Sequence, residues 1–398
     1  MSSQGGFGGF GGFGGFGGFG GFGGFGGFGG FGGFGGFGGF SAGGGFASPG
    51  AFDNQALIQH RDGIVGSWVT PTFGDYPAQL TQDVPGNTRR WEPWVRAELI
   101  DFDMFSRLHF ARDSGGFTLW DVDVVTAPTA QPPTATATPQ RIVRMKRPPN
   151  DSSTQNFWAT QLDIVASWAD LRAERSGEIL SQMAPPAAYW SSIVNLHPDR
   201  TPATLELLWA ALRLANHAEM RFKHALACRR PAEMSPQLQP MILTPGHGSL
   251  PSGHATEAHI VAHVLWAILD KADNSKKYPW FDQLMRQASR VSINRTIAGV
   301  HFPVDSVAGQ VLGLALGEYF VHRARQVNVQ GGYSSWDFIG TVYPKTLDFD
   351  WRKLYSTLPN QGTVRVDQPY AKVIGANEKV KPSPLLNALW QKAITEWP

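Results

Sequence analysis

The spacing of apolar residues predicts helices over most of the chain after residue 152. Between residues 155 and 183 apolar side chains recur three or four positions apart, as on the buried face of a helix, and two prolines follow. The same spacing predicts four more long helices and a short final one, over residues 204–228, 255–271, 280–297, 304–325 and 385–395. We therefore expect a mainly α fold built from packed helices.

The pattern before residue 152 is mixed, with frequent Gly and Pro. Residues 117–125 look strand-like. Residues 127–140, with the sequence APTAQPPTATATPQ, are expected to form a Pro/Thr-rich loop on the surface. Residues 331–398 are again mixed until the final helix, so the helices make up the main part of the expected fold.

The first tenth of the chain repeats the triplet GGF. Residues 5–40 hold twelve Phe and twenty-four Gly, and the other 362 residues have ordinary globular usage. One Phe at every third position fits neither a helix nor a strand, and Gly loses the most freedom on folding. We expect residues 1–50 to be a disordered tail and linker, or alternatively a Phe-spaced tail for self-association or docking. Residues 51–398 would form the folded domain, with a motif core at 204–325.

Composition and charge exclude several functional classes. A net charge of +2 argues against a protein that binds nucleic acid through bulk charge. The single cysteine, Cys228, excludes a disulfide scaffold and a cysteine-based zinc or iron–sulfur site. No run reaches 18 apolar residues, and the N-terminus lacks the pattern of a secretory signal. We therefore expect no transmembrane segment and a cytoplasmic location.

The first segment with candidate chemistry is Lys223-x6-Arg230-Pro231. The two cations stand seven residues apart, about two helical turns, so both point the same way near the end of a predicted helix. Taken alone, this pair favours a solvated basic face over a binding site.

The second segment, Pro251-Ser252-Gly253-His254, directly precedes a predicted helix. Unpaired backbone N–H groups and the helix dipole attract an anion at such a place, and Gly253 lets a ligand approach the backbone closely. His254 can exchange protons near neutral pH. The alternative is a Ser N-cap with an incidental His.

The third segment runs from Arg295 to Asp305 and contains His301. Pro303 fits the first position of the next helix, which places Asp305 in its first turn. A carboxylate there can accept one N–H of His301, fix the tautomer and make the other ring nitrogen a better ligand or nucleophile. Alternatively, Asp305 only complements the helix dipole.

Together the segments supply three cations, neutral donors and two histidines, which suits a tetrahedral oxyanion such as phosphate or vanadate. Lys-x6-Arg-Pro, Pro-Ser-Gly-His and Arg-x5-His-x3-Asp, in this order, resemble the signature of the type-2 phosphatidic acid phosphatase and vanadium haloperoxidase superfamily. The third motif departs at Asn294, where Ser is usual, which puts any role of that hydroxyl in doubt. The resemblance implies packed helical bundles with the oxyanion at one end of a bundle.

The resemblance also implies a role for each matching residue. His301 would bond to vanadium, or attack phosphorus in a phosphatase. His254 would be the acid/base group on the opposite side, and Asp305 would orient His301. The residues implied to bind the equatorial oxygens are Lys223, Arg230, Ser252, Gly253 and Arg295.

Two chemistries share such a site. We expect a vanadate-dependent haloperoxidase, in which hydrogen peroxide oxidises a halide that then halogenates a small organic acceptor. The alternative is a soluble acid-phosphatase-like phosphomonoesterase that uses His301 as nucleophile. His247 lies seven residues before His254, where the bromide-preferring haloperoxidases that this chain resembles carry His and chloroperoxidases carry Phe. We therefore expect bromide or iodide, unless His247 is a loop residue without contact to the site.

Other interpretations concern the residues outside these motifs. His259 and His263 share a helix face and could chelate a metal, but Ile260 stands where a zinc protease has Glu. The fourteen Trp are expected in the core rather than in a redox relay. A scaffold with a vestigial site and a working GGF tail is a further hypothesis, which the intact site residues argue against. The resemblance also implies a homodimer or larger homo-oligomer.

Overall fold

The structure, a computed structural model, describes residues 60–61, 63–72, 74, 77–126, 135–149, 155–272, 280–325, 332–358 and 362–397. The predicted tail, residues 1–50, lies outside this part of the chain. Two compact units divide the chain, Met1–Leu99 and Ile100–Pro398. The first unit carries the 3-10 helix η4 (Pro85–Arg90) and the start of α4 (Pro93–Phe105). All of the predicted site residues lie in the second unit.

The second unit is rich in helices, at the places that the apolar spacing predicts. The helix expected over residues 155–183 is α5 and α6, joined by the 3-10 turn η6, and the bounds of the predicted helices are confirmed to within two residues. The helices are α5 (Gln155–Ser167), η6 (Trp168–Leu171), α6 (Arg172–Ser181), α7 (Ala187–Val194), α8 (Pro202–Leu226), α9 (Pro231–Met234), η7 (Pro236–Leu238), α10 (Gly253–Ala272), α11 (Trp280–Ile297), α12 (Pro303–Ala324) and α13 (Pro384–Thr395).

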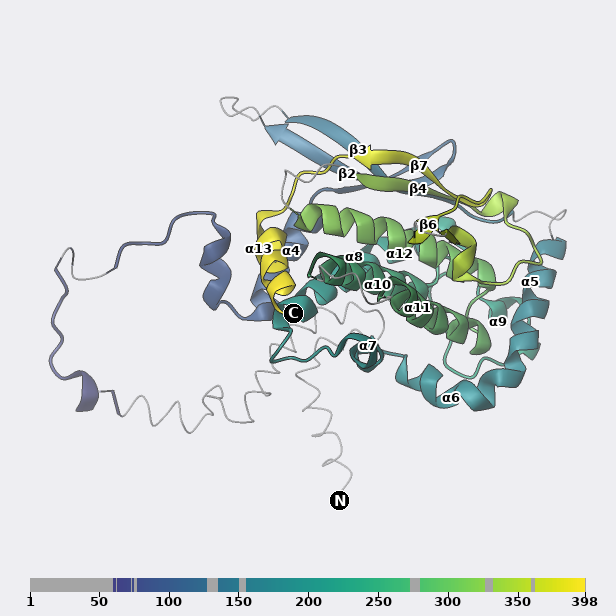
Figure 1. Cartoon of the computed structure of the whole chain (residues 1–398), viewed down its shortest axis with the longest axis horizontal. Coiled ribbons are helices and arrows are strands. Elements are labelled where there is room, and N and C mark those ends of the chain that lie inside the picture. Colours follow the sequence, from purple (N-terminus) through teal and green to yellow (C-terminus); the bar gives the residue numbers. More distant parts are fainter. Residues whose placement is uncertain are drawn as a thin grey trace, which may run out of the picture. The chain divides into compact units, whose positions relative to one another are not determined.

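Helix α10 is the centre of the helical packing. It is buried along almost its whole length and packs against α8, α11 and α12 (Figure 1). A Cβ on Gly309 would lie 2.6 Å from the carbonyl oxygen of Ser252, and one on Gly313 would lie 2.5 Å from that of Thr256. These two glycines let α12 approach α10 closely, with the first turns of both helices side by side. The backbone N–H of Ser252 donates to the carbonyl oxygen of Asp305 at 2.9 Å across this contact.

A mixed five-stranded sheet forms a layer beside α12, which contacts β3 and β4 (Figure 1). Its order is β1-β2-β3-β4-β7, and neighbouring strands are antiparallel except for the parallel pair β3 and β4. The strands are β1 (Leu108–Asp113), β2 (Gly116–Thr126), β3 (Ala135–Lys146), β4 (Tyr333–Ile339) and β7 (Ala371–Glu378), with a separate hairpin of β5 (Tyr355–Leu358) and β6 (Gly362–Arg365). The short 3-10 turns η8 (Gly340–Val342) and η9 (Trp351–Leu354) connect β4 to β5.

The expectation of a mainly α fold is confirmed in part, since the fold is helix-rich but also contains a mixed five-stranded sheet. The strand expected over residues 117–125 is confirmed as β2. The loop expected over residues 127–140 is wrong at its end, because β3 begins at Ala135; residues 127–134 lie outside the described part. The start of β3 is poor in large apolar residues, so its strand depends on backbone pairing with β2, which a local pattern does not reveal.

No helix within the described ranges is both long enough and apolar enough to cross a lipid bilayer.

Candidate active site

The three predicted segments meet where α10 and α12 begin. Lys223 comes from the last turn of α8, Arg295 from the last turn of α11, and Arg230 lies directly before α9. His254 lies in the first turn of α10 and Asp305 in the first turn of α12. Most of the predicted site residues are at most 4% exposed, and this buried set is Lys223, Arg230, Ser252, Arg295, His301 and Asp305.

His301 is held by Asp305, as the spacing of the third motif indicates. The Nδ1 atom of His301 lies 3.0 Å from Oδ2 of Asp305. The same oxygen accepts the hydroxyl proton of Ser249 and, at 2.9 Å, the backbone N–H of Phe302. Burial raises the pKa of Asp305 to about 6, so the carboxylate is ionised at neutral pH. Nδ1 of His301 therefore carries the proton, and Nε2 carries the lone pair.

Arg230 points its guanidinium at that lone pair. Its Nη1 atom lies 2.8 Å from Nε2 of His301 and also donates to the carbonyl oxygen of Val300 at 2.8 Å. Arginine can only donate, so Nε2 accepts, and His301 is the neutral imidazole. Burial, together with Arg230 and Lys223, holds the pKa of His301 well below its usual value. A neutral imidazole with an oriented lone pair is a nucleophile or a metal ligand.

Arg295 has hydrogen-bonding groups that the protein leaves unused. Its Nη2 atom donates to the carbonyl oxygen of Ile179 at 3.1 Å and to Oε1 of Gln182 at 3.4 Å. Its Nε and Nη1 atoms are buried and have no partner among the described residues. Burial lowers the pKa of Arg295 to about 10. Buried unpaired N–H groups of a cation are costly, and an oxyanion would satisfy them.

Lys223 adds a third cation under the loop that precedes α10. Its Nζ atom donates to the carbonyl oxygen of Pro251. Burial lowers the pKa of Lys223 to about 8, although Glu219 acts in the opposite direction. Lys223 is therefore still mostly protonated at neutral pH.

Ser252 and Gly253 show both features that the second motif left open, namely a Ser N-cap and a close approach to the backbone of the glycine. The Ser252 Oγ atom accepts the backbone N–H of Ala255 at 3.4 Å, so Ser252 caps α10, and its own N–H is used by Asp305. A Cβ on Gly253 would lie 2.5 Å from Oε1 of Glu219. A side chain at Gly253 would therefore displace the Glu219 carboxyl group.

His254 is half-buried, and its Nε2 atom donates to the carbonyl oxygen of Gln182 at 2.9 Å. This contact leaves Nδ1 as the ring nitrogen that can accept or deliver a proton. Burial and the charge of Arg295 hold the pKa of His254 well below its usual value. A bound anion would offset the charge of Arg295 and raise the pKa of His254 again.

Two buried carboxyl groups that the sequence motifs did not single out lie among these cations. Burial and Glu257 raise the pKa of Glu219 well above its usual value, and burial raises the pKa of Glu257 to about 7. Helical spacing could have found both, since Glu219 precedes Lys223 by four residues and Glu257 follows His254 by three. The site therefore combines three cations with three carboxyl groups, Asp305 included, rather than three unopposed cations.

Gln182 is a further site residue that the motifs did not reveal. Its Oε1 atom accepts from Nδ2 of Asn294 at 2.9 Å and from Arg295, while its backbone carbonyl holds His254. The amide of Asn294 thus has a defined partner in this chain, where the related motifs carry Ser. Gln182 follows α6, more than a hundred residues before Arg295, so no local spacing links the two residues.

His247 contacts the site through Arg230. Its Nδ1 atom lies 3.1 Å from Nη2 of Arg230, and its backbone carbonyl accepts from Nε of Arg230 at 3.0 Å. The alternative that His247 is a loop residue without contact to the site is therefore wrong. His247 also lines a solvent-open hollow of about 1070 Å³, together with Arg229, Glu233 and Thr244. Burial and the two cations Lys223 and Arg230 lower the pKa of His247 to about 4.

The other histidine pair packs inside the helical layer. The Nδ1 atom of His259 donates to the carbonyl oxygen of Ala255 at 2.7 Å, and the ring of His263 lies 5.4 Å from that of Trp266. Within the described ranges, no group of three or more His, Cys, Asp or Glu side chains gathers as it would around a metal ion.

Two solved structures illustrate what the chain is similar to. The bacterial vanadium-dependent iodoperoxidase is 19% identical, with a TM-score of 0.35, over 44% of this chain and 51% of that one, so the chain spans about half of its length. The transmembrane PAP2-type phosphatidylglycerolphosphate phosphatase from Bacillus subtilis is 20% identical, with a TM-score of 0.35, over 45% of this chain and 91% of that one. No curated protein matches the sequence.

A family match coincides with the site. The profile of the PAP2 superfamily matches residues 205–328, a segment that begins before Lys223 and ends after Asp305. This segment covers α10, α11 and α12 and nearly all of α8. Residues 205–328 are therefore similar to the PAP2 superfamily, whose members are enzymes, namely phosphatases or haloperoxidases.

Proposed function

We propose that this protein is a vanadate-dependent haloperoxidase that oxidises bromide or iodide with hydrogen peroxide. The proposal is carried by the two unpartnered, buried nitrogens of Arg295 together with the neutral His301, whose Nε2 lone pair faces Arg230. This donor set fits a tetrahedral oxyanion and one covalent or coordinate bond to a histidine nitrogen.

The residues present fit vanadate. The side chains and backbone groups that would hold it are those of Lys223, Arg230, Ser252, Gly253, Arg295 and His301. When bound, vanadate would supply a Lewis-acid centre that activates hydrogen peroxide towards a halide. The cations and the buried donors bind and orient the anion, and the Asp305 contact keeps Nε2 of His301 unprotonated.

The overall reaction of halide, hydrogen peroxide and one proton to hypohalous acid and water consumes a proton. His254, with its free Nδ1 atom, is the group that we assign to hold and deliver that proton. His247 lies between the solvent-open hollow and Arg230, where an incoming halide would pass. Together with the His at this position in the bromide-preferring enzymes that the chain resembles, this placement supports bromide or iodide as the substrate.

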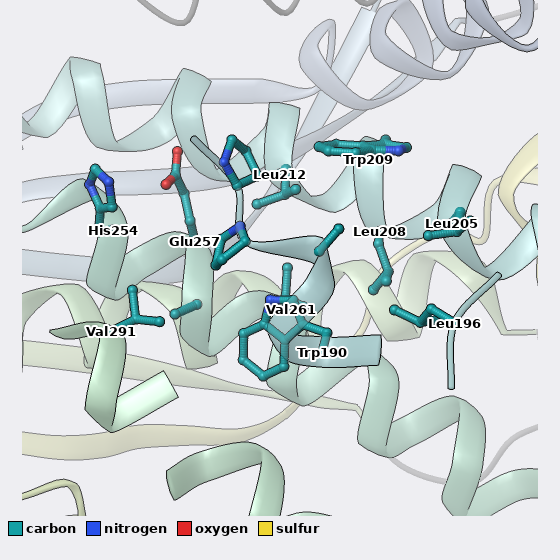
Figure 2. A pocket seen from close by; sticks show the side chains of 14 residues that line it. Trp190, Leu196, Leu205, Leu208, Trp209, Leu212, His254, Glu257, Val261 and Val291 are labelled. Carbon is teal, nitrogen blue, oxygen red and sulfur yellow. The ribbon is translucent and has the colours of Figure 1, made fainter. Parts of the chain in front are cut away.

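A phosphomonoesterase is the second candidate, because an apolar pocket adjoins His254 (Figure 2). Nε2 of His301 would form a bond to phosphorus as the ester P–O bond breaks, and the leaving oxygen would take the proton of His254. Water would then attack phosphorus, give a proton to His254 and release phosphate with the electron pair returned to Nε2. A pocket beside the leaving group has a direct use in this reaction.

One paired assay separates the two functions. The purified full chain is incubated with and without orthovanadate, then tested for bromination of a phenol-red-type dye with hydrogen peroxide and bromide, and for hydrolysis of p-nitrophenyl phosphate. We expect vanadate-dependent bromination. Phosphatase activity that needs no vanadate, with no bromination, would instead establish the second candidate.

His301→Ala tests the site itself. It should abolish whichever activity is found, because Nε2 of His301, held 2.8 Å from Arg230, is the atom that we assign to bond to vanadium or to phosphorus. The matched control is His109→Ala, which removes an exposed histidine from β1 and should leave the activity unchanged. Retained activity in His301→Ala would show that the reaction takes place elsewhere.

A further inference from the structure

A second cavity reaches the site from the side of His254. It is a partly open pocket that lies between α7, α8 and α10, near the end of the α6–α7 connection. Its lining consists of Pro185, Pro186, Ala187, Trp190, Leu196, Leu205, Leu208, Trp209, Leu212, His254, Glu257, Ala258, Val261 and Val291. The hollow beside His247 shares none of these residues.

The lining of this pocket is ionisable at one end and apolar elsewhere. Figure 2 shows His254 and Glu257 at one end and Trp209, Leu205 and Leu196 towards the other. His254 and Glu257 are the only ionisable side chains among the fourteen, and the rest are aliphatic side chains, prolines and two tryptophans. Pockets of this kind bind the apolar body of a small molecule and orient it through a few polar groups.

We propose that this pocket binds an aryl alcohol, or the aryl group of its phosphate ester, with the ring against the apolar walls and the oxygen at His254 and Glu257. The indole ring of Trp209 and the aliphatic rings of Pro185 and Pro186 line the pocket, and an aromatic ring packs favourably against both kinds of surface. The proposal rests on the proposed function, because it takes His254 to be the proton-transfer group of the oxyanion site.

An aryl alcohol serves both candidate reactions. In halogenation it is the acceptor: ArOH and hypohalous acid give X–ArOH and water, and the carbon–halogen bond replaces a carbon–hydrogen bond. In ester hydrolysis it is the leaving group: the P–O bond breaks and the phenolic oxygen takes the proton of His254. The chemistry recognised by the pocket is therefore the same, and only the bond made or broken at the oxyanion site differs.

The pocket beside His254 and the hollow beside His247 differ in polarity, so they would admit different ligands to the site. Halide and phosphate are charged and hydrogen peroxide is polar, and the solvent-open hollow beside His247 and Arg229 offers them polar contacts. The apolar pocket beside His254 disfavours such polar species, because they would lose hydration without gaining hydrogen bonds along its walls. An organic group bound there would also keep water away from the His254 side of the site.

The test measures binding apart from turnover. 2-Naphthol is titrated calorimetrically into the full chain and into three variants. Trp209→Ala removes one wall of the pocket, and Leu205→Trp fills its outer end. The control is Trp266→Ala, which removes a comparably half-buried Trp of α10 that packs against Phe281 and does not line the pocket. We expect one bound 2-naphthol per chain, binding at least fivefold weaker in both pocket variants, and binding unchanged in the control.

Two further experiments distinguish an aryl phosphate ester from an aryl alcohol as the ligand, and separate the pocket proposal from the proposed function. The KM for 2-naphthyl phosphate, or for 2-naphthol with peroxide and bromide, should rise in the pocket variants, whereas the activity with glycerol phosphate or the rate of triiodide formation from iodide should not change. Naphthol should still bind to His301→Ala. No naphthol binding, or equal binding in all variants, overturns the pocket proposal; naphthol binding combined with full activity of His301→Ala overturns the proposed function and not the pocket.

Discussion

Arg295→Gln should separate anion binding from folding. The substitution removes the two buried nitrogens, Nε and Nη1, that have no partner in the described protein. Each charge-assisted hydrogen bond to an anion contributes about 1.5–3 kcal/mol. Losing two of them should weaken oxyanion binding by about 3–6 kcal/mol, which corresponds to roughly 10²- to 10⁴-fold in Kd.

The stability of the protein without an anion should respond quite differently. Burial lowers the pKa of Arg295 to about 10, and this corresponds to a penalty of about 3 kcal/mol for holding the charged group inside the protein. Arg295→Gln relieves that penalty and gives up the Nη2 contacts to Ile179 and Gln182, each of which stabilises by about 1 kcal/mol. The free energy of unfolding should therefore stay within about 1 kcal/mol of the original value or rise.

The assay combines calorimetric titration with thermal unfolding in the absence and presence of inorganic phosphate and orthovanadate. A ligand at one hundred times its Kd stabilises by about 2.7 kcal/mol, so the original chain should show a raised Tm and Arg295→Gln should show none. Arg290→Gln is the matched control, because Arg290 lies on the same helix, pairs with Glu178 at 2.7 Å and is 48% exposed. A large loss of stability in Arg295→Gln with anion binding retained would refute this reasoning, since Arg295 would then be a structural residue.

The remaining predictions concern single features of the site. Asp305→Asn should lower kcat about 10- to 100-fold while the Kd for phosphate changes less, because the tautomer and orientation of His301 are no longer fixed; an equal change in both would point to anion binding instead. The affinity for sulfate, whose charge is constant, should rise as pH falls from 8 to 6, because burial raises the pKa of Glu257 to about 7 and the carboxyl group becomes neutral below it; Glu257→Gln should flatten this dependence, and an unchanged profile would exclude Glu257. His247→Phe should change the ratio of bromide to chloride turnover with phosphate binding retained, and an unchanged ratio would remove His247 from the mechanism. Deleting residues 1–40 should leave kcat/KM unchanged, and a loss of activity would contradict the interpretation of this segment as a tail.

Local sequence patterns were sufficient to predict the helices and the positions of the motifs relative to them. The apolar spacing predicts the bounds of α8, α10, α11 and α12 because each of these helices buries a continuous face in one packed layer. The expectation that Lys223 and Arg230 stand two helical turns apart is wrong, because α8 ends at Leu226 and Arg230 lies directly before α9. The structure nevertheless buries both side chains. The solvated basic face that the pair alone favours is therefore wrong.

Non-local pairing explains what the sequence did not reveal. Strand β3 pairs in parallel with β4, so that Val143 lies beside Trp336, and no local period records such a partner. Gln182 reaches Asn294 and Arg295 only because α6 packs against α11. Both contacts depend on the tertiary fold.

The carboxyl groups give the site a property that neither the motifs nor the cations alone would have. With Glu219, Glu257 and Asp305 all ionised, their charges would cancel those of Lys223, Arg230 and Arg295. Burial raises the pKa of both glutamates, which favours their neutral forms, and a bound anion would raise their pKa further. If the site binds an anion as proposed, we expect binding to be coupled to proton uptake beside His254. Both candidate reactions consume or transfer a proton at that side of the site, so the same glutamates that tune anion affinity also keep protons available where the chemistry needs them.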